Sequence, residues 1–369
     1  MNKPEEFALK LERVERYLAD HDLDGVILAR SDNFAWLGCG ANNVVNSAQE
    51  TGVGALVVRP GRVTLLASNI ETERLVTEEL SGLDIGDIEL FPWHEPARRE
   101  AIVVHLAEGS SFAADDASAG LPPLPDDFVR LRYELTEAEI ERYRALGEDA
   151  ARAMENAARA VEKGMTEPEV AALIADGCLK TGILPIVLLV AADERVRNWR
   201  HPIVKSAPVR QCVMMVTCGR RRGLVAALTR LVHMGEAPEG LKQRHRAVCA
   251  VDAAMIAATI PGARAGEVFA KAQEAYAENG FADEWLRHHQ GGAIGYQARE
   301  YIAGPQSPQI IEPNQAFAWN PSVRGTKSED TVLVGEQGFE LLTAPSADWP
   351  VLTVQAGGKS IPRADILVK

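Results

Sequence analysis

The sequence of 369 residues predicts an α/β (α+β) fold in two domains, because three features of the chain agree. Short β-rich runs alternate with amphipathic stretches over residues 1–116. The segment 117–128, ASAGLPPLPDDF, is rich in proline and small residues, as linkers are. After it, long helices followed by strands occur twice. We therefore expect an α/β domain over residues 1–125 and a larger domain over residues 126–369.

The first domain shows a regular succession of elements. Residues 4–21 have the apolar spacing of an amphipathic helix, and residues 54–68 give a hairpin signal around Pro60-Gly61. Further helices are expected over residues 69–80 and 99–109. The other strands of a mixed sheet are expected over residues 24–30, 88–93 and 111–116.

The second domain begins with two helices that carry capping boxes, Thr136-x-x-Glu139 and Thr166-x-x-Glu169. In such a box the hydroxyl and the carboxylate each accept a hydrogen bond from a free backbone amide. The run 224–232 fits a strand or a helix. The other elements are strands over 186–192 and 211–219, helices over 239–258 and 266–280, and strands near the end of the sequence.

Composition excludes several classes of partner. The formal net charge of −13 argues against nucleic acid and anionic membranes, since both attract basic surfaces. The first residues are charged rather than typical of a signal peptide, and no apolar run is long enough to span a membrane. The five cysteines are scattered and form no CxxC pair, which is typical of reduced thiols. We expect a cytoplasmic protein.

Six segments of the second domain occur in an order that resembles a known family. The order is similar to that of the pita-bread fold of methionine aminopeptidase, prolidase, aminopeptidase P and creatinase, and the two-domain layout resembles the last three. The resemblance implies a creatinase-like N-terminal domain and a pita-bread catalytic domain. The segments are LTEAEIERYR, GMTEPEV, the single His201, VTCGRRRGLVAALTRL, HHQGGAIG and KSEDTVLV.

The resemblance also implies positions for the ligands of two divalent metal ions, and this chain departs from them. Metal-dependent members use two aspartates, one histidine and two glutamates, which suit such ions. Only one matching position keeps a carboxylate, so we expect no metal ion and no other cofactor. A single-metal site formed by His201, His288 and Glu329 stays an alternative. The five positions are Thr217 (with Val216 as the other candidate for this position), Ala227, Gly292, Asn320 and Glu329.

His201 matches the position of the catalytic histidine of creatinase, and imidazole can take and give a proton at neutral pH. The resemblance therefore predicts a metal-independent hydrolase that cleaves a C–N bond in a small amino-acid-derived substrate. His201 is expected to be the general acid and base, with His288 and Glu329 as catalytic partners. Lyase or isomerase chemistry stays open in the same pocket. Thr229 and Asn320 stand where creatinase has its two guanidinium-binding glutamates, so creatine itself is not expected.

The expected substrate contacts follow from the same resemblance. Arg299 replaces a histidine that contacts substrate in the peptidases, so it is expected either to bind a carboxylate or to pair with Glu300 on the surface. Strand alternation directs Thr217 toward the pocket and Cys218 away from it, as a buried structural thiol. Trp319 fits the core as well as the pocket wall. The full substrate-binding set is Thr217, Thr229, Gln290, Arg299, Glu300, Trp319 and Asn320.

Two other functions stay open at this point. One is a non-catalytic pita-bread module that binds peptides. The other is an Xaa-Pro-type metallopeptidase, which requires the ligand assignment to be wrong. The expected partners are a small-molecule substrate and a second copy of the chain in a homodimer, whose Asn42 and Asn43 would reach the neighbouring pocket.

Overall fold

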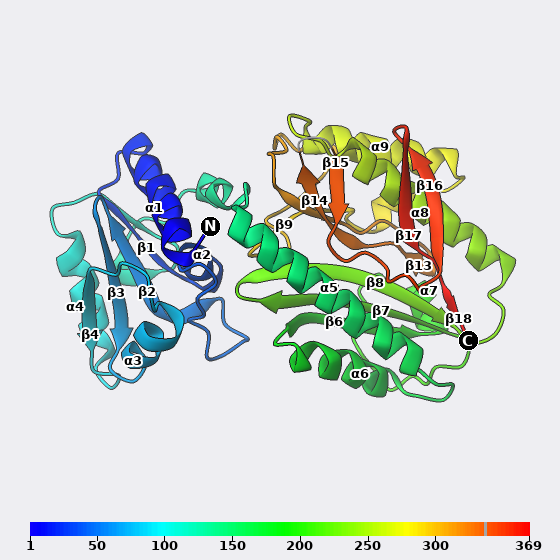
Figure 1. The fold of residues 1–369 in the computed structure, drawn as a ribbon, viewed down its shortest axis with the longest axis horizontal. Helices are drawn as coiled ribbons and strands as arrows, with labels where there is room; N and C mark the ends of the chain where they lie inside the picture. The colour runs from blue at the N-terminus through cyan, green and yellow to red at the C-terminus, as the bar shows by residue number, and fades with distance from the viewer. Residues whose placement is uncertain (336–337) are drawn as a thin grey trace. The chain divides into compact units, whose positions relative to one another are not determined.

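The computed structural model describes residues 1–335 and 338–369 and divides into two compact units. Unit 1 contains residues 1–132 and 136–139, and unit 2 contains residues 133–135 and the chain from Ile140 onward. Helices pack against sheets in both units, which confirms the predicted α/β class (Figure 1).

Unit 1 is built around a mixed five-stranded sheet. Its strands are, in spatial order, β4 (Asp87–Phe91), β3 (Arg62–Ser68), β2 (Thr51–Arg59), β1 (Gly25–Arg30) and β5 (Phe112–Ala114). The predicted hairpin is formed by β2 and β3, and Gly61 takes the positive φ of 73° that this tight turn requires. β1 pairs with β5, and β3 with β4, in parallel, so the sheet is mixed as expected.

The helices of unit 1 are α1 (Lys3–Asp20), α2 (Ser31–Leu37), α3 (Thr72–Arg74) and α4 (Pro96–Ala107). The helix expected over residues 69–80 is short, because α3 passes into a π-helical turn over Leu75–Glu79. The segment 117–128 is only partly a linker. A 3-10 turn over Asp126–Arg132 begins within it, and there Asp127 accepts from the Tyr17 hydroxyl of α1 at 2.7 Å.

The first half of unit 2 contains α5 (Glu137–Ala160), α6 (Glu167–Lys180) and the short α7 (Glu194–Asn198). Both capping boxes form, and the backbone amides of Thr136 and Thr166 each donate to a glutamate oxygen at 2.7 Å. The run 224–232, whose pattern fitted either a strand or a helix, is a strand. Every residue of it is buried, so the sequence shows no alternation of polar and apolar residues that would have identified the strand. The sheet order is β18 (Leu367–Val368), β8 (Leu224–His233), β7 (Cys212–Arg221) and β6 (Leu184–Ala192).

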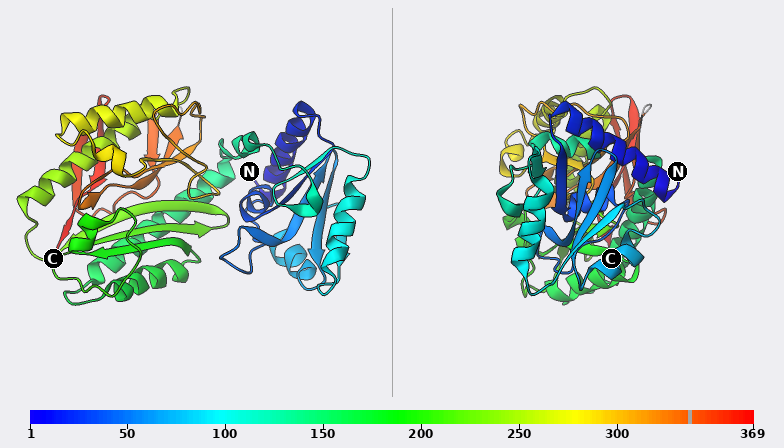
Figure 2. Two further views of the ribbon diagram at one scale, coloured as in Figure 1. Left: turned by 180° about the vertical axis from the view of Figure 1, so that it is seen from behind. Right: turned by 90° about the vertical axis from the view of Figure 1, so that its left-hand side faces the viewer.

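The second half of unit 2 contains α8 (Glu239–Ala258) and α9 (Ala265–Glu278), which pack on a second sheet. The two sheets of unit 2 lie between α5 and α6 on one side and α8 and α9 on the other (Figures 1 and 2). The second sheet has the order β10 (Tyr301–Ile302), β9 (Gly291–Ile294), β11 (Ala316–Trp319), β14 (Asp330–Gly335) and β15 (Gly338–Leu341). Two hairpins complete the unit, β12 (Ser322–Val323) with β13 (Thr326–Lys327) and β16 (Val351–Ala356) with β17 (Lys359–Ala364).

All five cysteines are buried free thiols, as expected for a reduced protein. Within residues 1–335 and 338–369, none of the helices is both long and apolar enough to cross a membrane.

Candidate active site

The candidate site lies in unit 2, where one line of residues crosses β9, β11, β14 and β8. Trp319 pairs with Gly291 on one side and with Asp330 on the other. One residue further along, the Asn320 amide donates to the Gln290 carbonyl at 3.0 Å. Beside them, the Thr229 amide donates to the Glu329 carbonyl at 3.1 Å. The strand register therefore gathers residues that lie up to about a hundred positions apart in the sequence.

Glu329 forms the centre of this site, and its carboxylate is only 2% exposed. Its Oε2 accepts from the Thr229 hydroxyl at 2.8 Å and lies 2.7 Å from the ammonium of Lys327. Its Oε1 accepts from Nη2 of Arg299 at 3.0 Å. One carboxylate is thus held by two buried or nearly buried cations and one hydroxyl.

The charge balance fixes the protonation state of Glu329. Burial alone would raise the pKa of its carboxyl, because burial disfavours the ionised form. The charges of Lys327 and Arg299, with the hydrogen bonds from Lys327 and Thr229, outweigh burial and lower this pKa to about 2. At neutral pH, Glu329 is therefore ionised and serves as an anchor for cations rather than as a proton donor.

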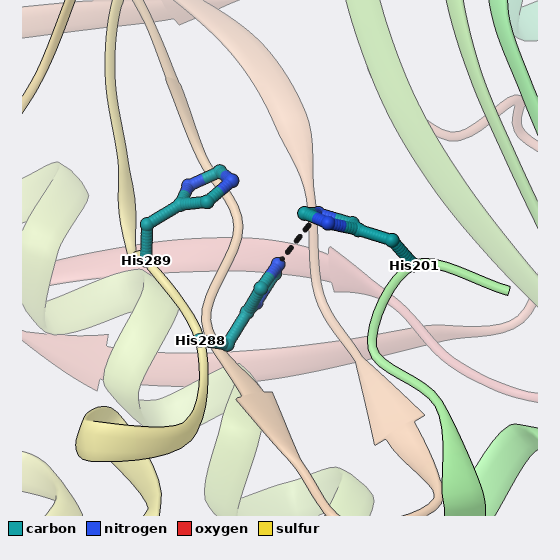
Figure 3. Close-up of side chains that lie close together, drawn as sticks. All are labelled: His201, His288 and His289. Carbon is teal, nitrogen blue, oxygen red and sulfur yellow. Dashed lines mark hydrogen bonds between the residues drawn. The ribbon is translucent and has the colours of Figure 1, made fainter.

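Three histidines gather close together (Figure 3), and the charges of Lys327, Glu329 and Arg299 act on His201. His201 comes from the segment after α7, and His288 and His289 come from the segment before β9. Nε2 of His288 lies 3.0 Å from Nε2 of His201. One ring nitrogen of each histidine lies within 4.8 Å of the others. His201 is exposed and the other two are half-buried, so solvent reaches the cluster.

The surrounding hydrogen bonds connect the His201–His288 pair to Ser322 and Arg200. The Ser322 hydroxyl oxygen lies 3.2 Å from Nδ1 of His288 and also accepts from Nη1 of Arg200 at 3.2 Å. A serine hydroxyl both donates and accepts, so two proton arrangements fit these distances. In one, Ser322 accepts from Nδ1 of His288, His201 donates from Nε2 to His288, and Nδ1 of His201 is unprotonated. In the other, Ser322 donates to His288, and His288 donates to His201.

All three imidazoles are held in their neutral form. Burial and then the charge of Lys327 lower the pKa of His201, and the same two causes lower the pKa of His288 far below its ordinary range. Burial, followed by the charge of Arg299, lowers the pKa of His289 to about 4. Neutral imidazole is the form that accepts a proton or binds a metal ion.

The residues at this site do not fit a dinuclear metal centre. Ala227 and Gly292 offer no ligand atom, and Asn320 offers only a neutral amide. A Cβ atom at Gly292 would lie 2.1 Å from the carbonyl oxygen of Tyr301, so even an added side chain has no room at that position. The one remaining carboxylate, Glu329, is already bound by two cations of the protein itself.

The orientation expected for Thr217 and Cys218 is wrong. Cys218 pairs with Ala227, and Val216 with Thr229, so these side chains share the face of the site. Thr217 lies on the opposite face, where its hydroxyl donates to the Val187 carbonyl at 3.0 Å. Thr217 therefore faces away from the site, and Val216 is the better match to the first ligand position. Burial raises the pKa of the Cys218 thiol to about 11, which agrees with a structural cysteine.

Three other expected contacts have structural roles. Trp319 is fully buried in the core and donates from Nε1 to Thr259 at 2.9 Å, so it does not line the pocket. The Gln290 side chain accepts from the Tyr276 hydroxyl at 2.8 Å and donates to the His288 carbonyl, so it positions the histidine segment. Glu300 accepts from the amide of Tyr296 at 2.8 Å and closes a turn.

The remaining predicted residues do meet. The structure brings together His201 and His288, and it joins Glu329, Thr229 and Arg299. Arg299 pairs with Glu329 at 3.0 Å. Asn320 is buried, and its Oδ1 has no hydrogen-bond partner among the residues that the structure describes.

The sequence analysis missed Lys327 and Ser322. Lys327 is the first residue of KSEDTVLV, and its position two residues before Glu329 on an extended segment was a usable signal. Ser322 gave no signal, because its contact with His288 depends on the tertiary fold.

Comparison with known proteins agrees with this architecture. The profile of metallopeptidase family M24 matches residues 141–336, more than half of the chain. The chain belongs to metallopeptidase family M24. The prolidase of Pyrococcus horikoshii OT3 has a similar structure, with a TM-score of 0.78 and 19% identity over 92% of this chain and 99% of that one. At this identity the likeness shows the fold alone, and it confirms the expected pita-bread architecture.

Two curated relatives of this M24 protein are named as dipeptidases. The Xaa-Pro dipeptidase of Lactobacillus delbrueckii subsp. lactis is 23% identical over 244 residues, 63% of this chain and 66% of that protein. The probable dipeptidase PepE of Mycobacterium tuberculosis (strain H37Rv) is 28% identical over 235 residues, 60% of this chain and 62% of that protein. The matches thus span slightly less than two thirds of either relative.

Proposed function

We propose that this M24 protein hydrolyses a C–N bond in a small amino-acid-derived substrate without a metal ion, using His201 as general acid and base. Membership of a peptidase family and the dipeptidase names of its relatives support C–N hydrolysis. The single observation that carries the metal-free mechanism is the His201–His288 pair at 3.0 Å, beside a carboxylate already neutralised by Lys327 and Arg299.

The proposal adopts for His201 and His288 the proton arrangement in which Ser322 accepts from His288, and this arrangement gives His201 its role. Its unprotonated Nδ1 takes a proton from a water molecule whose oxygen attacks the carbonyl carbon. The imidazolium that forms is stabilised by the Nε2 acceptor of His288, which Ser322 holds in place. When the C–N bond breaks, His201 returns the proton to the leaving nitrogen. One water molecule is consumed, and an acid and an amine are released.

The charges favour an anionic substrate. Glu329 supplies one negative charge, and Lys327 and Arg299 supply two positive charges. An unbalanced positive charge in a partly buried site attracts a carboxylate. Within residues 1–335 and 338–369, Nε of Arg299 is a buried donor without a partner, and Oδ1 of Asn320 is a buried acceptor without one. A substrate that carries both a carboxylate and an N–H group, as amino-acid amides and dipeptides do, would satisfy both atoms.

The test is a turnover screen on a panel of dipeptides (Xaa-Pro included), N-acyl amino acids and amidines, with chelator present. We expect turnover that survives chelation, and a fall in kcat of about 100-fold or more for His201→Ala. The matched control is His105→Ala, which removes an exposed histidine of unit 1. Turnover that requires added manganese or cobalt, or full turnover by His201→Ala, would overturn the proposal. Tight binding of panel members with no turnover would favour the peptide-binding module instead.

A further inference from the structure

The three histidines form a set of ligand atoms distinct from the five positions that the family resemblance assigns to metal ions. Their nitrogens lie within 4.8 Å of one another, and two of them are only 3.0 Å apart (Figure 3). Nitrogens bound to one zinc ion at about 2.0–2.1 Å lie roughly 3.4 Å apart in a tetrahedral site. The His201–His288 separation is close to this value, and His289 needs a small side-chain movement to join.

His288 is already oriented as a ligand. Its Nδ1 lies 3.2 Å from the Ser322 hydroxyl, which Arg200 also contacts at 3.2 Å, so the ring is held with Nε2 toward His201. With Nδ1 as the donor, Nε2 carries the lone pair that a metal ion needs. Histidine ligands are commonly held by such a bond from the second ring nitrogen. The proton between His201 and His288 occupies the position where a metal ion would bind both rings. His289 would have to release its long contact of 3.3 Å with the Gly291 amide.

The donor set selects the class of ion. Three imidazoles without a carboxylate suit Zn²⁺, Cu²⁺ or Ni²⁺ rather than Mg²⁺, Ca²⁺ or Mn²⁺. Exposure of His201 leaves a fourth position open to water, as in zinc sites with three protein ligands. The nearby cations Lys327, Arg299 and Arg200 weaken the binding of any dication, although each pairs with a glutamate. The site should therefore bind zinc reversibly and not as a permanent structural ion.

We propose that His201, His288 and His289 bind one ion of the zinc class, and that this ion inhibits the protein by occupying its two proton-carrying histidines. The inhibitory half rests on the proposed function above. The binding half depends only on the geometry of the three imidazoles.

The binding test uses Co²⁺ as a spectroscopic probe and Zn²⁺ by calorimetry on the purified full chain. We expect one Co²⁺ per chain with visible absorption bands of a nitrogen-ligated ion, displaced by Zn²⁺. His289→Ala and His288→Ala should each weaken Zn²⁺ binding at least 10-fold, whereas His105→Ala should not. Thermal unfolding of each variant controls for folding, and half-buried His289 is the variant that should tolerate replacement best. Equal Zn²⁺ affinity in wild type and both cluster variants would overturn the proposal.

Measurements of substrate turnover separate the inhibitory half of the proposal from the binding half. If a substrate is found, Zn²⁺ should inhibit its hydrolysis over the same concentration range in which it binds, and chelator should restore the rate. Zinc binding without inhibition would reject the inhibitory half and leave the site itself. If no substrate is found, the proposed function fails, while the Co²⁺ spectrum and the variant affinities still decide whether the metal site exists.

Discussion

Glu329 and Asp330 are neighbours in the sequence, yet their carboxylates belong to two buried ion clusters with different designs. Asp330 belongs to a closed network with Arg230, Arg363 and Asp252, all at most 2% exposed. Arg363 lies 2.6 Å from Asp330 and 2.7 Å from Asp252, and Arg230 lies 2.9 Å from Asp330. Glu329 belongs to an open cluster with Lys327 and Arg299, beside the partly exposed His201 and His288.

Charge separates the two clusters more clearly than burial does. The closed network also includes buried Glu155, which lies 3.5 Å from Arg230 and 3.6 Å from Arg159. Counted with Arg159, the network contains three guanidinium groups and three carboxylates, so its charges balance when all are ionised. The open cluster contains one carboxylate and two cations, so one positive charge is left over. A balanced and sealed network stabilises the fold, whereas an unbalanced cluster next to solvent needs a ligand to complete it. Three predictions examine this contrast.

The largest effect is expected from breaking the closed network. Asp330→Ala leaves two buried guanidinium groups without their shared partner, which should lower the free energy of unfolding by about 3–5 kcal/mol. Urea denaturation of the purified chain measures the change. The control is Glu340→Ala, which removes the partner of the exposed Arg144 and should have a far smaller effect. Asp330→Asn is measured in parallel in case the alanine variant does not fold. Similar small effects of the Asp330 variants and the control would refute the structural role of the closed network.

The second prediction is that the two clusters respond to pH in opposite directions. Burial raises the pKa of Asp252 from 3.8 to about 6, so its contribution to stability is fully present below pH 3.8 and is lost as pH rises through 6. The pKa of Glu329 is lowered to about 2, so its contribution is present above pH 4.5 and is lost as pH falls toward 2. The groups that act on Asp252 are Arg363, Ser328, Asp330 and Glu329.

Variants with a neutral side chain at either position reveal how each carboxyl group makes stability depend on pH. Relative to Asp252→Asn, the wild type should lose on the order of 2 kcal/mol of stability between pH 4 and pH 7. Relative to Glu329→Gln, the wild type should instead gain stability between pH 2 and pH 5. The measurement is the urea midpoint of each variant over this pH range. Parallel curves for the wild type and Asp252→Asn would show that the closed network does not control the pKa of Asp252.

The sequence predicted local features well because their causes are local. The helix expected over residues 239–258 coincides with α8, and both capping boxes form, since each needs only contacts three residues apart. The pairing of His201 with His288 was predicted through the family resemblance. The faces of Thr217 and Cys218 were assigned wrongly, because they depend on the register of β7 against β8, and a shift of one residue reverses every side chain.

The burial of the ion clusters could not be predicted from sequence patterns. Lys327 in a strand is ordinarily a solvent-exposed residue, and only the fold shows it buried at 4% exposure against Glu329. The sequence likewise gave Arg363 no role, although it joins two carboxylates that lie 78 positions apart, at 252 and 330.

The smallest effect should come from filling the open cluster with a simple anion. Acetate supplies one carboxylate to the unbalanced charge of Lys327 and Arg299 and should stabilise the chain by about 1.4 kcal/mol at ten times its dissociation constant. Thermal unfolding with and without acetate measures the gain, and acetamide, which has a similar shape and no charge, should give none. Lys327→Met should abolish the gain, whereas Lys271→Met, which removes an exposed ammonium paired with Glu274, should retain it. If acetate stabilises the wild type and Lys327→Met equally, the surplus charge does not lie in the open cluster, and the contrast with the closed network fails.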